Sequence, residues 1–159
     1  MTIGAQLTST QKGKVTEQLV ASALLIASNG RLAPFVPLAD DHGLDLIVLD
    51  KVTRRIIAIQ VKSAMANASR GTVQFDVRKQ TYSMAKGEYL PMVVFEPARM
   101  ALAASWLIPM AVVPTVSTDQ AEKYALAPSL KATATDRCRS YRRDDVLALA
   151  AAVQKELDG

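Results

Sequence analysis

The sequence predicts an α/β protein in which helices flank a central mixed β-sheet. Three observations support this class: a helical pattern of apolar residues near the N-terminus, two adjacent apolar runs with strand character in the middle, and a second helical pattern at the C-terminal end. The expected order is a helix, three strands, further strands with a short helix, and a final helix. This order favours one sheet covered by helices.

The first part of the chain is expected to supply the first helix and three strands. Apolar residues recur at helical spacing up to Ala27, and Asn29-Gly30 is a stop signal. Pro34 and Pro37 limit the next strand to an edge or irregular one. The two runs after it are apolar throughout, which suits a sheet covered on both faces. The expected elements are a helix at about 10–28, strands near 32–38, 44–49 and 56–63, and a turn at 40–43.

The later part of the chain is expected to extend the sheet and to end in a helix. Ser140 is the candidate N-cap of that helix, and Val146, Leu149 and Val153 belong to its apolar stripe. The expected elements are a loop at 64–71, strands at 72–77, 90–96 and 106–113, short helical segments at 79–86 and 119–123, and a last helix at 141–157.

Length and composition indicate one domain, with 159 residues of which 50% are hydrophobic and 21% charged. Its core motifs are expected at about 10–113, followed by an extension with a helix at about 117–157. Cys138 is the only cysteine, which leaves no disulfide within the chain and favours a cytoplasmic location. No run approaches the roughly 20 apolar residues of a membrane span. The net charge of +4 mildly favours an acidic partner such as nucleic acid.

A carboxylate, an amide and an ammonium group are expected to meet at the end of two adjacent strands. Asp45 opens the first strand, and Gln60-Val61-Lys62 closes the second. Because strand side chains alternate, Gln60 and Lys62 share one face while Ile59 and Val61 share the other. A hairpin of this length can bring Asp45 beside the polar pair. The set suits a hard cation next to a phosphate, which is the outline of a metal-dependent nuclease.

Further residues extend this set into an ordered series over about residues 10–63. The series runs Lys12-Gly13, Glu17 on the first helix, Gly43-x-Asp45, and Gln60-x-Lys62-Ser63. This order resembles the PD-(D/E)xK nuclease superfamily, and it is most similar to the small Holliday-junction-resolvase-like and restriction-endonuclease-like members. The resemblance implies a restriction-endonuclease-like core.

The resemblance also implies a role for each residue. Asp45 matches the metal-binding aspartate, and Gln60 occupies the second acidic position. Lys62 matches the catalytic lysine, and Glu17 matches a helix-borne glutamate of some branches. The sequence departs from the common pattern at Gln60, because an amide oxygen can bind a hard cation but brings no negative charge. Metal affinity is therefore expected to be lower unless Glu17 supplies the missing carboxylate.

The expected cofactor is Mg²⁺, with Mn²⁺ as a substitute and no small-molecule cofactor. Mg²⁺ prefers oxygen ligands and keeps several waters. Its candidate ligands are Asp45, Gln60, Glu17 and the backbone carbonyl of Val61. Lys62 is expected to orient the attacking water or to stabilise developing negative charge.

Several charged residues lie outside this set. The candidate contacts to a DNA backbone are Lys12, Lys14, Arg78, Lys79, Arg142 and Arg143. Arg142 and Arg143 belong to an arginine cluster before the last helix, which is either a phosphate clamp or a solvated basic loop. Asp50 and Asp76 are expected to be surface residues at strand ends, with Asp76 as a reserve metal ligand.

Three functions remain open at this point. The leading one is a Mg²⁺-dependent DNA endonuclease, expected as a homodimer so that two active sites face two strands. The second is a catalytically inactive nuclease-fold protein that binds nucleic acid or a protein partner. The third is a structural or interaction protein in which the spacing of Asp45, Gln60 and Lys62 is chance. The substrate also stays open between a branched junction, a duplex with a recognition site and a single strand.

Overall fold

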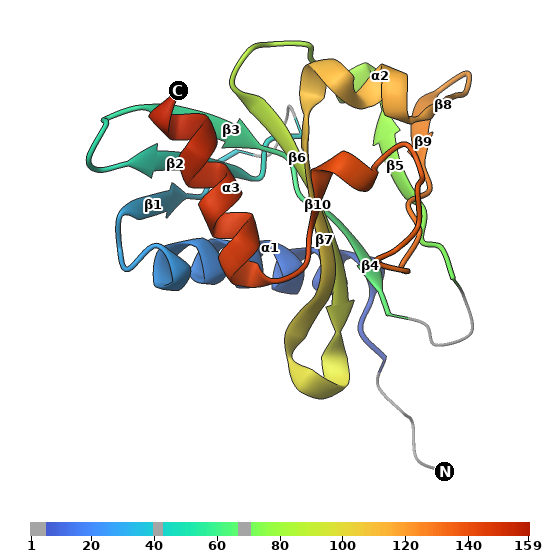
Figure 1. The fold of residues 1–159 in the computed structure, drawn as a ribbon, viewed down its shortest axis with the longest axis horizontal. Helices are drawn as coiled ribbons and strands as arrows, with labels where there is room; N and C mark the ends of the chain where they lie inside the picture. Colours follow the sequence, from blue (N-terminus) through green and yellow to red (C-terminus); the bar gives the residue numbers. More distant parts are fainter. Residues whose placement is uncertain (1–5, 40–42, 67–70) are drawn as a thin grey trace.

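The computed structural model describes residues 6–39, 43–66 and 71–159 (Figure 1). Its helices are α1 (Ser9–Ala27), α2 (Val113–Val116) and α3 (Val146–Asp158), with short 3-10 helices η1 (Lys79–Thr81), η2 (Pro97–Arg99), η3 (Met110–Val112) and η4 (Arg139–Tyr141). Its strands are β1 (Leu32–Phe35), β2 (Leu46–Asp50), β3 (Ile56–Ile59), β4 (Lys62–Met65), β5 (Phe75–Arg78), β6 (Glu88–Glu96), β7 (Ala101–Pro109), β8 (Thr118–Asp119), β9 (Lys123–Leu126) and β10 (Arg142–Arg143).

The main sheet is mixed, which confirms the predicted fold class. Its order is β1-β2-β3-β6-β7-β10, and β4 also pairs with β6. Strands β1, β2 and β3 form an antiparallel meander, whereas β3 and β4 both run parallel to β6. Strands β5, β9 and β8 form a second, antiparallel sheet, which lies on the other side of the molecule from α3 (Figure 1).

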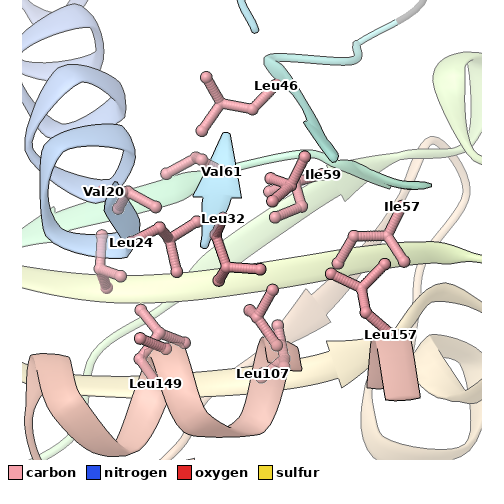
Figure 2. Close-up of a cluster of buried hydrophobic side chains, with 14 residues drawn as sticks. Val20, Leu24, Leu32, Leu46, Ile57, Ile59, Val61, Leu107, Leu149 and Leu157 are labelled. Carbon is pink, nitrogen blue, oxygen red and sulfur yellow. The ribbon is translucent and has the colours of Figure 1, made fainter. Parts of the chain in front are cut away.

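Two hydrophobic cores cover the two faces of the main sheet. Helices α1 and α3 pack on one face, where Leu24 and Leu149 meet the strand residues Ile59 and Leu107 (Figure 2). The second sheet and α2 pack on the opposite face, around the fully buried Trp106. Burial on both faces explains the apolar run at residues 90–95 of β6, all of which are buried.

The first helix begins close to its predicted start because Thr8 caps it. The Thr8 hydroxyl accepts a hydrogen bond from the Gln11 amide, and the Gln11 side chain accepts one from the Thr8 amide. The predicted start of the last helix is wrong. Residues 142–143 pair with β7 instead, and the Asp145 carboxylate accepts the Ala148 amide as the true N-cap.

Other predicted boundaries also change. The strand expected at 56–63 is interrupted at Gln60-Val61, and the helix expected at 79–86 is only the 3-10 turn η1. Strand β7 begins earlier than expected and ends at Pro109, so the remainder of 106–113 is helical rather than extended. Residues 119–123 are not helical either, because they span the end of β8, the hairpin turn at 120–122 and the start of β9. Most of the predicted turn at 40–43 lies outside the described residues.

No helix in the described part of the chain is long and apolar enough to span a membrane.

Candidate metal and phosphate site

One cleft of about 450 Å³ brings together residues from five separate segments. We call it the site cleft; its lining residues are Gly13, Glu17, Gly43, Asp45, Gln60, Val61, Lys62, Ser63, Arg78 and Thr81. They come from α1, the segment before β2, the junction of β3 and β4, the end of β5, and η1. The structure therefore places Glu17, Asp45, Gln60 and Lys62 around one space.

Asp45 is fixed by the interruption between β3 and β4. Its Oδ2 accepts a hydrogen bond of 2.6 Å from the Val61 amide, and its own amide donates to the Ile59 carbonyl at 2.9 Å. The Val61 amide thus donates to a side chain instead of to a backbone carbonyl of a neighbouring strand. Strand β3 therefore ends at Ile59, and strand pairing resumes in β4 at Lys62. Asp45 is thus oriented by Ile59 and Val61, the two residues that flank Gln60 in the chain.

Gln60 is the most buried polar residue of the cleft, with 5% of its surface exposed. Its backbone amide donates to the Tyr89 carbonyl at 3.0 Å. Its side-chain Oε1 is buried and has no hydrogen-bond partner among the described residues. A buried acceptor without a partner costs free energy. A cation or a donor on a ligand would remove that cost.

Gly43 allows the Gln60 amide group to occupy this position. Its φ is +71°, a conformation that residues with side chains rarely adopt. A Cβ at residue 43 would also lie 2.6 Å from Gln60 Nε2. A larger residue here would have to displace the Gln60 side chain.

Lys62 and Arg78 bring positive charge to the cleft. Lys62 is half-buried at the start of β4, and Arg78 is exposed at the end of β5. The positive charge of Lys62 also acts on the Asp76 carboxyl. Burial raises the pKa of the Asp76 carboxyl, but hydrogen bonds from Lys123 and Gln74 and the charge of Lys62 lower it below its ordinary value overall.

Glu17 lines the same cleft from α1, with 14% of its side chain exposed. Its Oε2 forms an ion pair of 2.8 Å with Lys14 Nζ, one turn earlier on the helix. Lys14 is thereby placed beside the cleft, whereas Lys12 lies in the first turn of α1 and its carbonyl accepts the Thr16 hydroxyl.

The other predicted DNA contacts are held by protein groups. Lys79 forms an ion pair with Asp119, which raises the pKa of Lys79, and its ammonium lies 5.1 Å from the centre of the Tyr124 ring. Arg143 is half-buried and donates to the Arg142 carbonyl at 2.7 Å.

Arg142 has the most extensive contacts of the six basic residues. Its guanidinium lies 5.4 Å from the centre of the buried Trp106 ring and donates to the carbonyls of Ser129 and Leu130, each at 3.1 Å. These contacts do not favour a DNA contact by Arg142, which stays a prediction.

The donor set of the cleft fits a hard divalent cation that keeps part of its water. Asp45, Glu17 and the unpartnered Gln60 Oε1 offer oxygen atoms only, which suits Mg²⁺ better than a softer metal. Within residues 6–39, 43–66 and 71–159, no group of three or more histidine, cysteine, aspartate and glutamate residues is placed to hold a metal. A cation in this cleft would take the amide oxygen of Gln60 as a third donor beside the two carboxylates.

The opposite end of β2 carries a different polar group. Asp50 was expected at the surface, but none of it is exposed. Its Oδ1 and Oδ2 accept hydrogen bonds from Arg31, the shortest at 2.5 Å, and Oδ1 also accepts the Val52 amide at 2.8 Å. Arg31 pairs with Asp158 as well, which joins β2 to the end of α3. The Arg31 guanidinium holds the pKa of Asp50 well below its ordinary value.

Thr81 is a cleft residue that sequence reasoning did not identify. It reaches the cleft because η1 turns the chain back after β5, and no sequence signal marks that position. Gly43 was part of the motif series, but its close approach to Gln60 becomes visible only in three dimensions.

Comparisons with known proteins show the fold. The structure is similar to that of a bacterial homing endonuclease, I-Ssp6803I, with a TM-score of 0.61, 18% sequence identity and 96% of each chain covered. It also matches Hjc, a Holliday junction resolvase from the archaeal hyperthermophile Archaeoglobus fulgidus, with a TM-score of 0.41, 10% identity, and coverage of 75% of this chain and 96% of that one. No family model and no curated protein matches the sequence. The first likeness shows that the chain has the fold of that endonuclease.

Proposed function

We propose that this chain is a Mg²⁺-dependent DNA endonuclease whose active site is the site cleft. The observation that carries the proposal is the meeting of Asp45, Lys62 and the unpartnered oxygen of Gln60 in one cleft. The fold shared with a homing endonuclease supports a phosphodiester of DNA as the substrate. The reaction adds water to phosphorus and breaks the bond to one bridging oxygen, which leaves a phosphomonoester and a hydroxyl group.

In this proposal the charge of each cleft residue determines its role. Asp45, Gln60 and Glu17 hold the cation, which supplies charge neutralisation and a hydroxide-like nucleophile when bound. Lys62 stabilises the negative charge that develops on the phosphate oxygens. Arg78, exposed at the rim, binds the DNA backbone and orients it. The Val61 amide keeps the Asp45 carboxylate in a fixed orientation throughout.

The test is nicking of supercoiled plasmid under a titration of Mg²⁺ or Mn²⁺, with EDTA as the metal-free condition. Lys62→Ala should lower the nicking rate by about 100-fold or more, since removal of one transition-state donor has effects of that order. DNA binding should change little. The matched control is Lys155→Ala, which removes an exposed lysine from α3 outside the cleft and should nick like wild type. Nicking in EDTA, or equal rates for both variants, would contradict the proposal.

A second candidate is a nuclease-fold protein that binds DNA without cutting it. One observation favours it: the described part of the cleft holds only two carboxylates, and Lys14 pairs with one of them. This candidate predicts DNA binding that weakens steeply with salt and no nicking at any Mg²⁺ or Mn²⁺ concentration. The plasmid experiment therefore separates the two.

A further inference from the structure

A second and larger cavity adjoins the site cleft and has a different chemistry. Its volume is about 750 Å³, and we call it the side cavity. Gly43, Gln60 and Thr81 line both spaces, so the side cavity begins where the metal and phosphate site ends. Its volume lies within the range of small-molecule sites in proteins, roughly 300–1,000 Å³.

The charges of the two spaces differ. The site cleft contains Lys62 and Arg78, whereas no lysine or arginine is among the described residues that line the side cavity. The only charged group among those described residues is Glu88, at the start of β6. A carboxylate repels phosphate, so the side cavity does not suit the DNA backbone. The side cavity suits an uncharged part of the DNA instead.

The remaining lining offers uncharged hydrogen-bonding groups and an aromatic ring. Gln80 is exposed on η1, and the half-buried Ser83 follows it in the next segment. Tyr82 is held in place, because its hydroxyl donates to the Met110 carbonyl at 2.8 Å and its ring meets Tyr124 edge-on at 5.0 Å. Amide and hydroxyl groups read the edges of nucleobases, and a rigid aromatic ring provides a surface on which a base stacks.

We infer that the side cavity binds an unpaired nucleobase next to the scissile phosphate, so that DNA with an unpaired nucleotide is preferred to fully paired duplex. A base that remains stacked and paired cannot leave the helix to enter a lateral cavity; it must be unpaired or flipped out. Glu88 can accept from an exocyclic amino group, while Gln80 can both donate and accept. The inference rests on the proposed function, since it takes the site cleft as the position of the phosphate.

The test measures binding without cleavage, by fluorescence polarisation in EDTA at low salt. Three labelled probes are compared: a full duplex, the same duplex with one unpaired nucleotide, and a version in which that nucleotide lacks its base. Wild type should bind the unpaired probe about tenfold more tightly than the duplex, because base–aromatic stacking has effects of this order. The gain should disappear with the base-free probe.

Gln80→Ala should reduce the preference several-fold while duplex affinity stays unchanged. Gln154→Ala is the matched control, since it removes a glutamine from α3 outside both spaces.

Equal affinity for all three probes, including undetectable binding, or an equal effect of the two variants, would overturn the inference. Mg²⁺-dependent nicking without any preference for unpaired DNA would overturn only the inference. A preference in EDTA that depends on Gln80, with no nicking in Mg²⁺, would support the base site and contradict the catalytic proposal.

Discussion

Strand β2 has an aspartate at each end, and the two carboxylates have opposite surroundings. Asp50 is completely buried, and Arg31 and the Val52 amide bind its oxygens. Asp45, just before the strand, accepts the Val61 amide and lines the open site cleft. The closed end joins β2 to α3 through Arg31 and Asp158, whereas the open end gathers polar groups from several segments around a space.

The groups around each aspartate, rather than the residue type, decide what its carboxylate does. At the closed end a guanidinium compensates the buried charge, so the group contributes to stability. At the open end Gln60 has a buried oxygen without a partner among the described residues, so that end is suited to an external ligand. Substitutions at the two ends should therefore separate stability from activity.

The largest effect is expected from Asp45→Asn. The amide oxygen can still accept the Val61 N–H, so the fold should remain, but the negative charge toward the cation is lost. Mg²⁺-dependent nicking should fall by about 100-fold or more, with a melting temperature close to that of wild type. Plasmid nicking and calorimetry measure the two quantities. An Asp45→Asn variant that nicks at the wild-type rate would remove Asp45 from the site.

Asp50→Asn should have the opposite result. The substitution leaves the Arg31 guanidinium facing a neutral group at the buried position 50, with Asp158 as its remaining carboxylate, and loss of this ion pair is destabilising. The melting temperature should fall by roughly 5–10 °C, while the nicking rate measured well below that temperature stays near wild type. A loss of nicking with an unchanged melting temperature would mean that the two ends are not separable.

Acid should reduce the difference in stability between wild type and Asp50→Asn. The hydrogen bonds from Arg31 lower the pKa of Asp50 in the folded protein below its unfolded value of about 4. A carboxyl with a depressed folded pKa contributes stability above the unfolded pKa and loses it as the pH falls through the folded value. The gap in melting temperature between wild type and Asp50→Asn should be constant from about pH 5 to 7 and shrink below about pH 4. A gap that widens in acid would contradict the ion-pair account.

The sequence predicts the open end better than the closed one, for a physical reason. Alternation along the expected strand predicts Gln60 and Lys62 on one face with Asp45 near them, and all three line the site cleft although the strand breaks at Gln60-Val61. The pairing of Arg31 with Asp50 and Asp158 depends on how α3 packs against the sheet, which local patterns do not encode. The same limit applies to Thr81, which reaches the cleft through the turn η1.

The fold class can likewise be predicted from the sequence, whereas some boundaries of strands and helices cannot. The α/β class follows from the order of apolar patterns, which is visible in the sequence. The break at Gln60-Val61 is not, because a side chain from another strand takes the Val61 amide. Likewise Ser140 is an acceptable N-cap by residue type, but pairing of Arg142 and Arg143 with β7 delays the helix to Val146.

A smaller effect is expected from Gln60→Glu, which sharpens the interpretation of the open end. The new carboxylate keeps nearly the same shape and adds a charge beside the proposed cation. The Mg²⁺ concentration for half-maximal nicking should fall by about tenfold, and Mg²⁺ should raise the melting temperature more than it does in wild type. A variant that melts earlier and is not rescued by Mg²⁺ or Mn²⁺ would indicate a buried charge without a cation.

The smallest effect should come from the arginines, where the same contrast between an open and a closed environment recurs. Arg78 is exposed at the rim of the cleft, whereas Arg142 is held by Trp106 and two backbone carbonyls. Arg78→Ala should weaken DNA binding a few-fold and make the slope of log K against log salt shallower by about 1, because one phosphate contact is lost. Arg142→Ala should leave that slope unchanged and lower the melting temperature, because packing and hydrogen bonds are lost. Polarisation titrations over a range of salt concentrations measure the slopes. If Arg142→Ala changed the slope and Arg78→Ala did not, the DNA backbone would lie along β10 rather than across the site cleft.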